Sequence, residues 1–217
     1  MTEGVRFYFD PLCPWCYQTS RWARRLEELG ELEVDWRVFS LAIVNGGDQG
    51  RAASDTGSAP ALRASVLVRR EHDAAAVGRF YAAQGAAIHE RGEPGDDITT
   101  VERSLQIAGL DPSLARRALE DPTTWDEVQR EHDDVVAVHR AFGVPTIVLD
   151  GVDGAAMFGP VIFEVPPDTE SRELWKHFSW LVRNGNFAEV KRERTRAPDL
   201  ESVRRYIQRK EEQTAAA

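Results

Sequence analysis

This sequence has few cysteines, no long apolar run and no excess of positive charge, and each shortage argues against a class of protein. No apolar stretch in the 217 residues approaches the roughly 18 residues that a transmembrane helix needs. The chain carries 27 Lys and Arg against 36 Asp and Glu, a net charge of −9 at pH 7. Because nucleic-acid binding needs a basic face, we expect neither nucleic acid nor a membrane as partner.

The first residues also lack the pattern of a signal peptide. Met1 to Gly4 lead directly into residues 5–9, Val-Arg-Phe-Tyr-Phe, which alternate like a strand. We therefore expect a cytoplasmic protein. At about 100–200 residues per domain, the length allows one large domain or two small ones.

Only two cysteines occur, Cys13 and Cys16, and they enclose Pro14 and Trp15. Two cysteines are too few for the disulfide framework of a secreted protein. They leave a four-ligand zinc site incomplete, and no histidine stands at ligand-like spacing beside them, so we expect no bound metal. The remaining interpretation is a redox-active dithiol, which forms and opens a disulfide during a reaction.

The surroundings of the cysteines predict a β-α-β unit. A strand over residues 5–9 is followed by a turn and by Pro14, at a position where the first turn of a helix tolerates proline. This helix would reach about Leu29 and stop at Gly30, and residues 32–41 alternate as a second strand. On the helix, we expect a buried face of Thr19, Trp22, Ala23, Leu26 and Leu29, and a solvent face of Arg21, Arg24, Arg25, Glu27 and Glu28.

The rest of the chain divides into a helical region and a returning hairpin. Residues 45–60 are rich in Gly, Ala, Ser and Asp and predict a mobile loop. Helices are expected over 61–76 and 77–90, from Asp97 or Thr99, and from Asp111-Pro112 and Asp121-Pro122. A hairpin is expected over 144–158, a helix over 169–183, and a frayed end over 213–217. The predicted units are 1–45 with 141–200, an insertion of loop and helices at 46–140, and a charged tail at 201–217.

A cysteine at the start of a helix is placed for nucleophilic chemistry. The thiolate attacks disulfides, and a free cysteine is mostly protonated at neutral pH. The positive end of the helix dipole and the first backbone N–H groups would favour the thiolate. We therefore expect Cys13 to be the exposed nucleophile and Cys16, one turn later, to be the resolving thiol. Pro14 and Trp15 would control access to the pair.

Several segments resemble known families. The C-x-x-C after the first strand, the helical insertion and Gly143-Val144-Pro145-Thr146 before a hairpin resemble the DsbA-like branch of the thioredoxin superfamily. That resemblance implies an α/β thioredoxin fold with an all-helical insertion. More specific segments are similar to the actinobacterial mycothiol-dependent nitroreductases. They are FDPLCPWC at 9–16, TSRW at 19–22, SLAIVN at 40–45, IH at 88–89, FGP at 158–160, LW at 174–175 and KRERTR at 191–196. Tyr17, where tryptophan is expected, and the 46–60 loop depart from that pattern.

This resemblance implies a function and further site residues. It implies reduction of disulfides or nitro compounds with mycothiol as the thiol donor, no tightly bound cofactor, and a mycoredoxin as protein partner. It also implies that Pro145 is cis and lies against the cysteines, which would leave the backbone of Val144 free to pair with substrate. Asn45, at the end of the second strand, and Tyr81 and His89 are further candidate substrate-binding residues. Arg192 to Arg196 would form a solvated face.

Three other functions fit parts of the pattern. A DsbA-type enzyme would oxidise protein dithiols and have a potential near about −120 mV, against about −270 mV for a thioredoxin-like reductase. A kappa-type glutathione transferase or isomerase uses serine where Cys13 stands, so the intact C-x-x-C disfavours it. A partner-binding or metal-holding module would function without Cys13 and carry stoichiometric zinc.

Overall fold

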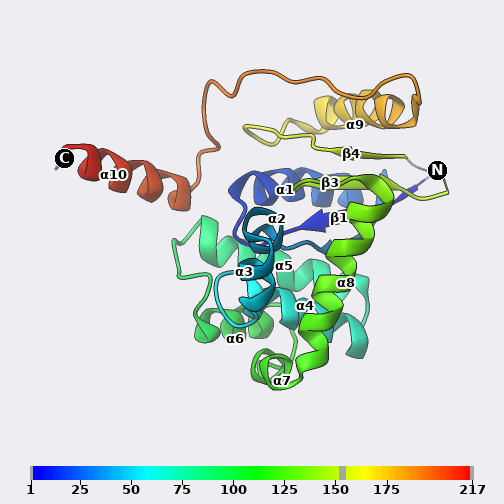
Figure 1. Ribbon diagram of the computed structural model, residues 1–217. Helices are drawn as coiled ribbons and strands as arrows, with labels where there is room; N and C mark the ends of the chain where they lie inside the picture. The colour runs from blue at the N-terminus through cyan, green and yellow to red at the C-terminus, as the bar shows by residue number, and fades with distance from the viewer. Residues whose placement is uncertain (1, 152–154, 216–217) are drawn as a thin grey trace.

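The sheet is built around the strand that precedes the two cysteines. A computed structural model describes residues 2–151 and 155–215 (Figure 1). Its sheet has the order β2-β1-β3-β4, formed by β1 (Glu3–Phe9), β2 (Leu32–Val38), β3 (Thr146–Leu149) and β4 (Ala156–Phe158). Strand β1 pairs in parallel with β2 and antiparallel with β3, and β3 pairs antiparallel with β4. The predicted mixed α/β sheet and its hairpin are confirmed, although residues 152–154 of the expected turn lie outside the described residues.

Helix α1 (Pro14–Glu28) connects the two parallel strands, as the β-α-β pattern predicts. Cys13 is its N-cap and Pro14 its first residue, and the chain turns away at Gly30 with a φ of +74°. Helix α9 (Asp168–Arg183) lies against α1, where the rings of Trp22 and Trp175 pack with centroids 6.1 Å apart. This packing holds α1 at the sheet from the side opposite to the insertion.

The insertion between β2 and β3 is helical, as predicted. It contains α4 (Ala59–Glu71), α5 (Ala74–His89), α6 (Ile98–Ile107), α7 (Leu114–Glu120) and α8 (Pro122–His139). Helices α4, α5 and α8 contact β2, so the insertion covers that edge of the sheet (Figure 1). Asp97 and Asp121 cap α6 and α8, as expected. Helix α7 begins later than Pro112, because the Asp111 carboxylate accepts from the Ser113 amide at 2.9 Å and holds a turn there.

The prediction of a loop over residues 45–60 is largely wrong. Strand β2 ends at Val38, and two short helices follow, α2 (Leu41–Gly46) and α3 (Asp48–Ala52). The Ser40 hydroxyl caps α2 by accepting from the Ile43 amide at 3.2 Å. The lack of a side chain at Gly50 lets α3 approach α2, since a Cβ there would overlap the Ala42 carbonyl. Asn45 therefore lies on a helix and is exposed, instead of ending the strand.

The C-terminal part crosses the molecule and ends in a helix. After α9, an extended segment runs to α10 (Glu201–Ala215), which projects away from the other elements in Figure 1. Helix α10 buries none of its residues. Near its start it is anchored by hydrogen bonds to the last residue of α5 and to the loop directly after α5. Residues 213–215 are helical rather than frayed, and 216–217 lie outside the described residues. Across the described ranges, none of the helices has the length and apolar character needed to span a bilayer. The division into units at residues 45 and 141 stays a prediction.

Candidate active site

The Cys13 sulfur lies between two backbone groups that are far apart in sequence. Its Sγ accepts a hydrogen bond from the Cys16 amide at 3.4 Å, in the first turn of α1. On its other side the thiol donates to the Val144 carbonyl at 3.7 Å. The predicted contact between the helix N-terminus and Cys13 is therefore present, and the predicted neighbourhood of Val144 and the cysteines is confirmed.

The Val144–Pro145 peptide bond is cis, as the family resemblance implies. Both residues are buried next to Cys13, at the start of β3. A second cis bond, Gly159–Pro160, follows β4, and the Pro160 carbonyl accepts from the Thr19 hydroxyl of α1 at 2.8 Å. The loop after β4 is thereby tied to the helix that carries the cysteines.

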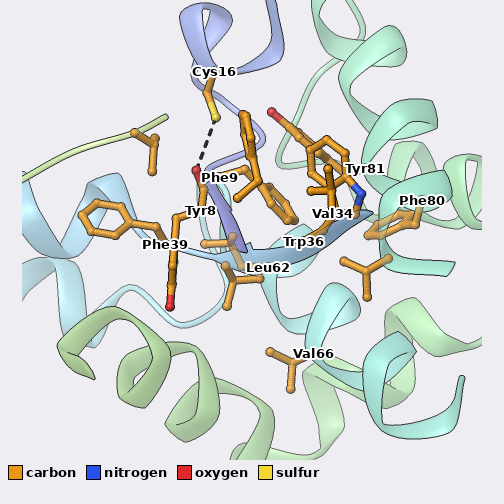
Figure 2. Packing of buried hydrophobic residues seen from close by; sticks show 14 of the residues in the cluster. Tyr8, Phe9, Cys16, Val34, Trp36, Phe39, Leu62, Val66, Phe80 and Tyr81 are labelled. Carbon is orange, nitrogen blue, oxygen red and sulfur yellow. Dashed lines mark hydrogen bonds between the residues drawn. The ribbon is translucent and has the colours of Figure 1, made fainter. Parts of the chain in front are cut away.

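Both cysteines are free thiols, and Cys13 is more enclosed than its assignment as the nucleophile predicts. Cys16 has no exposed surface, and Cys13 retains 8%. The Cys16 thiol donates to the Tyr8 carbonyl at 3.7 Å, drawn as a dashed line in Figure 2. The expectation of an exposed Cys13 is wrong in this structure, yet Cys13 is still the sulfur nearer the surface.

Burial outweighs the helix terminus in setting the acidity of Cys13. Loss of solvent raises the pKa of Cys13 to about 11, while the Cys16 and Trp15 amides and the Arg194 charge lower it and Asp10 raises it. Burial, followed by the neighbouring Cys13, holds the pKa of Cys16 well above its usual value. The helix terminus thus acts in the predicted direction, but the net shift is toward the neutral thiol because desolvation penalises the charged form.

Asp10 is a buried carboxylate that the sequence reasoning did not select. It accepts from the Leu12 amide at 2.9 Å, the Leu41 amide at 2.8 Å and the Ser58 hydroxyl at 2.9 Å. These bonds join the turn before Cys13 to the starts of α2 and α4. Burial raises the pKa of Asp10 despite these donors. The one sequence signal is an aspartate three residues before a C-x-x-C, directly after a buried strand.

Trp15 and Pro14 form the partly exposed side of the dithiol. The Trp15 ring packs edge-on against Phe163, with centroids 5.7 Å apart, in the loop after β4. Arg194 lies over Trp15 at 5.0 Å, and Arg196 lies over Phe163 at 4.9 Å. Residues 192–196 are exposed, as expected of a solvated face, and the same segment also returns to the aromatic residues beside the dithiol.

The three remaining candidate residues occupy different places. Tyr81 is 1% exposed and stacks on Phe9 with ring centroids 3.9 Å apart, beneath the dithiol rather than on a helix surface. His89 is also buried, and lies between the Pro11 carbonyl at 2.9 Å and the Ser202 hydroxyl at 2.8 Å. Burial lowers the pKa of His89 to about 4, so it is neutral at physiological pH. Substrate contact by Tyr81, His89 or the exposed Asn45 stays a prediction.

Arg24 was expected on the solvent face of α1, and its guanidinium instead turns inward. It lies 4.6 Å from the centroid of Trp36 and 5.0 Å from that of Tyr81. The reason is the insertion, since α5 places Tyr81 over this part of α1 and encloses the side chain. The sequence signal was the spacing of Cys16, Ser20 and Arg24 at every fourth residue, which puts them on one helix face.

The two sulfurs are arranged in a way that suits a dithiol reaction. The described residues contain no cluster of three or more histidine, cysteine or acidic side chains placed to share a metal ion. A surface-side sulfur next to an enclosed one can instead receive a substrate sulfur and then release it. Pro14 and Trp15 are partly exposed beside this pair, and substrate contact by them stays a prediction.

Comparison with known proteins identifies a family and similar folds. The family model described as "Rv2466c-like: Mycothiol-dependent nitroreductase Rv2466c" matches residues 12–192. Uncharacterized protein Rv2286c of Mycobacterium tuberculosis is 34% identical over 206 residues, covering 94% of this chain and 87% of that protein. The fold is similar to a 2-hydroxychromene-2-carboxylate isomerase, with TM-score 0.60, 16% identity and coverage of 83% and 95%. It is also similar to the cytosolic disulfide reductase DsbM of Pseudomonas aeruginosa, with TM-score 0.57, 19% identity and coverage of 82% and 99%.

Proposed function

We propose, since this chain belongs to the Rv2466c-like family of mycothiol-dependent nitroreductases, that its Cys13–Cys16 dithiol reduces disulfide or nitro substrates and is restored by mycothiol. The observation that carries this proposal is the Cys13 sulfur, held at the start of α1 between the Cys16 amide and the Val144 carbonyl. Cys13 is the nucleophile because it is the sulfur with remaining exposure, and Cys16 is the resolving thiol because it is enclosed one turn below.

The reaction with a disulfide proceeds in two exchanges. The Cys13 thiolate attacks one substrate sulfur, a mixed disulfide forms, and the other substrate sulfur leaves as a thiolate that takes up a proton. Cys16 then loses its proton and attacks Cys13 Sγ, and the second substrate sulfur leaves and is protonated. Two electrons and two protons pass from the dithiol to the substrate, and Cys13 and Cys16 become a disulfide.

Mycothiol would return the enzyme disulfide to the dithiol as a co-substrate. Cys13 accepts the first mycothiol sulfur in a mixed disulfide while Cys16 leaves as a thiol, and a second mycothiol releases Cys13 and forms mycothiol disulfide. The site fits this role because an incoming thiol meets Cys13 beside the partly exposed Pro14 and Trp15, whereas Cys16 is closed to it. The two electrons of the dithiol also match the reduction of a nitro group to a nitroso group, which consumes two protons and releases water.

The acidity of Cys13 favours a reductase over a protein dithiol oxidase. Strongly oxidising enzymes stabilise the reduced form through a very acidic thiol, with a pKa of about 3.5 in DsbA. Burial moves the pKa of Cys13 in the opposite direction, to about 11. A measured reduction potential nearer about −270 mV than about −120 mV would agree with the reductase.

We place this reaction in the cytoplasm, where low-molecular-weight thiols keep dithiols reduced. The similar Pseudomonas protein is described as cytosolic. Where a protein rather than mycothiol accepts the mixed disulfide, a mycoredoxin is the proposed partner. The mycoredoxin would attack the mycothiol sulfur of the mixed disulfide and release Cys13 as a thiol. Cys13 is the cysteine that retains exposed surface.

The test uses intact mass after exposure to mycothiol disulfide and, separately, to glutathione disulfide. Cys16→Ser should form one mycothiol adduct on Cys13, because the mixed disulfide cannot be resolved. Cys13→Ser should form none, since Cys16 is enclosed. A faster adduct with mycothiol than with glutathione would support the proposed co-substrate.

Other results would redirect the assignment. Equal labelling of both variants would overturn the roles given to the two cysteines. A Cys13 that reacts with alkylating agents but with neither low-molecular-weight disulfide would point to protein substrates and the DsbA-type alternative. Full function without Cys13, together with stoichiometric zinc, would establish the partner-binding or metal-holding module.

A further inference from the structure

Arg24 places a positive charge on the face of α1 that also carries the resolving thiol. Cys16, Ser20 and Arg24 follow one another at intervals of four residues, which aligns them along one side of the helix. Arg24 Nη1 donates to the Ser20 hydroxyl at 2.7 Å. Nε and Nη2 of Arg24 are buried and have no hydrogen-bond partner among the described residues.

Aromatic rings from two other elements enclose this guanidinium. Trp36 of β2 and Tyr81 of α5 lie 4.6 and 5.0 Å from it, measured from the guanidinium carbon to the ring centroids. Figure 2 shows Trp36 and Tyr81 together in the cluster beneath Cys16. The Tyr81 hydroxyl is buried and makes no hydrogen bond of normal geometry with any described residue. It is nevertheless near enough to Cys16 to lower the pKa of that thiol.

The charge of Arg24 is not neutralised by an ion pair within the described ranges. The charge of Glu27 raises the pKa of Arg24, but Glu27 Oε1 accepts its hydrogen bond from the Val34 amide, at 3.1 Å. Burial lowers the pKa of Arg24, but an arginine still keeps its proton in a protein. An unpaired buried cation is destabilising, so its position on the helix face that carries Cys16, a group that becomes an anion, is a functional signal.

The groups that act on the resolving thiol come from several elements. Burial is the largest influence on the Cys16 pKa and raises it, as do the charges of Cys13 and Asp10, while the Tyr81 hydroxyl and the Asp10 backbone lower it. The thiolate of Cys16 in turn favours the charged form of Arg24. The titratable groups that face this cluster are Asp10 at the end of β1, Cys13 before α1, Tyr17 and Glu27 on α1, and Tyr81 on α5.

We propose that Arg24, together with the Tyr81 hydroxyl, is a positioning group for the resolving step. Its buried charge favours the Cys16 thiolate at the moment that Cys16 attacks the mixed disulfide on Cys13. In that step the Cys16 S–H bond breaks, the Cys13–Cys16 disulfide forms, and the bound sulfur leaves and takes up the proton. This inference rests on the proposed function, because it assigns a role within the same dithiol exchange.

The experiment separates the two steps with dithiodipyridine, a small disulfide whose released thiopyridone is followed by absorbance. Reduced wild-type protein mixed with excess reagent should release one equivalent in a phase that depends on reagent concentration, when Cys13 attacks. A second equivalent should follow in a concentration-independent phase, when Cys16 resolves the adduct. Both rates are measured by stopped flow from about pH 6 to about pH 10, across which the thiolate fraction changes.

Arg24→Gln and Arg24→Met should slow only the second phase. A rise of about one unit in the Cys16 pKa reduces the thiolate fraction about tenfold. The more basic thiolate is about threefold more nucleophilic, which partly offsets this loss. The resolving step should therefore become about three- to fourfold slower at neutral pH. The pH profile of that phase should move upward along the pH axis. Arg24→Lys keeps the charge and should restore the rate, whereas a packing role alone would leave Lys no better than Met.

The matched control is Arg25→Gln, which removes a cation from the next position of α1, where Arg25 pairs with Asp168 at the surface. It should leave both phases unchanged. If the Arg24 variants do not fold, Tyr81→Phe removes only the hydroxyl and should slow the second phase in the same way. An unchanged second phase in every folded Arg24 and Tyr81 variant overturns the inference, whereas absence of the first phase in wild type overturns the proposed function itself.

Discussion

The Arg194 guanidinium lies 5.0 Å from the centroid of the Trp15 ring, inside the C-x-x-C sequence. The segment after α9 therefore reaches the active site from a position about 180 residues later in the chain. Arg194 also lowers the pKa of Cys13, the proposed nucleophile, because its positive charge favours the thiolate.

Arg194→Gln should therefore slow alkylation of Cys13 by about twofold at neutral pH, because an exposed charge shifts a neighbouring pKa only slightly. Salt should screen the interaction, so the difference from wild type should shrink at high ionic strength. The measurement is the rate of iodoacetamide labelling in a Cys16→Ser background. Arg192→Gln, a neighbouring exposed arginine, is the control and should label like its parent.

The reactivity of Cys13 should rise steeply with pH. Its pKa is raised to about 11, so the thiolate fraction increases about tenfold for each pH unit below that value. Labelling rates of Cys16→Ser should follow this slope through the neutral and mildly alkaline range. A plateau that begins by about pH 9 to 10 would contradict the raised pKa of Cys13, because it would indicate a thiol with the ordinary pKa of about 8.5.

Asp10→Asn should change reactivity and stability in opposite directions. The Asp10 charge raises the pKa of Cys13, so its removal should speed labelling of Cys13. Asparagine cannot replace all the acceptor sites that serve the Leu12, Leu41 and Ser58 donors, and the loss should destabilise the fold by about 1–3 kcal/mol. Urea unfolding measures the stability. Slower labelling in a folded variant would show that the carboxylate has another role.

Acid should destabilise the protein through buried histidines. Burial lowers the pKa of His89 and of His132 to about 4, below the value of about 6.5 for an unfolded chain. The unfolded chain therefore binds protons first as pH falls. The contribution of each residue is fully present above about pH 6.5 and declines by up to about 1.4 kcal/mol per pH unit down to about pH 4.

His89→Asn should accordingly weaken the pH dependence of the unfolding free energy over that range. It should also lower stability at neutral pH, because the Pro11 carbonyl and the Ser202 hydroxyl lose their ring partner. His177→Asn, an exposed substitution on α9, is the control. Equal pH slopes for wild type and His89→Asn would exclude His89 as a contributor to acid unfolding.

Much of the fold followed from local patterns. The end of β1 at Phe9, the extent of α1, the stop at Gly30 and the caps at Asp97 and Asp121 agree with expectation, because periodicity, helix caps and glycine act over a few residues. Strand β1 begins two residues earlier than predicted, at Glu3. The helices at 41–52 were missed because they are too short for a periodic pattern. They depend on distant contacts, such as Arg51 with Asp133 of α8 at 2.5 Å.

The sequence by itself determined the dithiol, its place between a strand and a helix, and the family. Only the tertiary structure decided how acidic and how accessible that dithiol is. A thiolate depends on everything that encloses its sulfur, and here those groups come from distant parts of the chain: Val144 before β3, Tyr81 of α5 and Arg194 after α9. Arg24 shows the same principle, because a helical pattern assigns a charged residue to solvent, and only the packing of α5 against α1 makes it a buried cation.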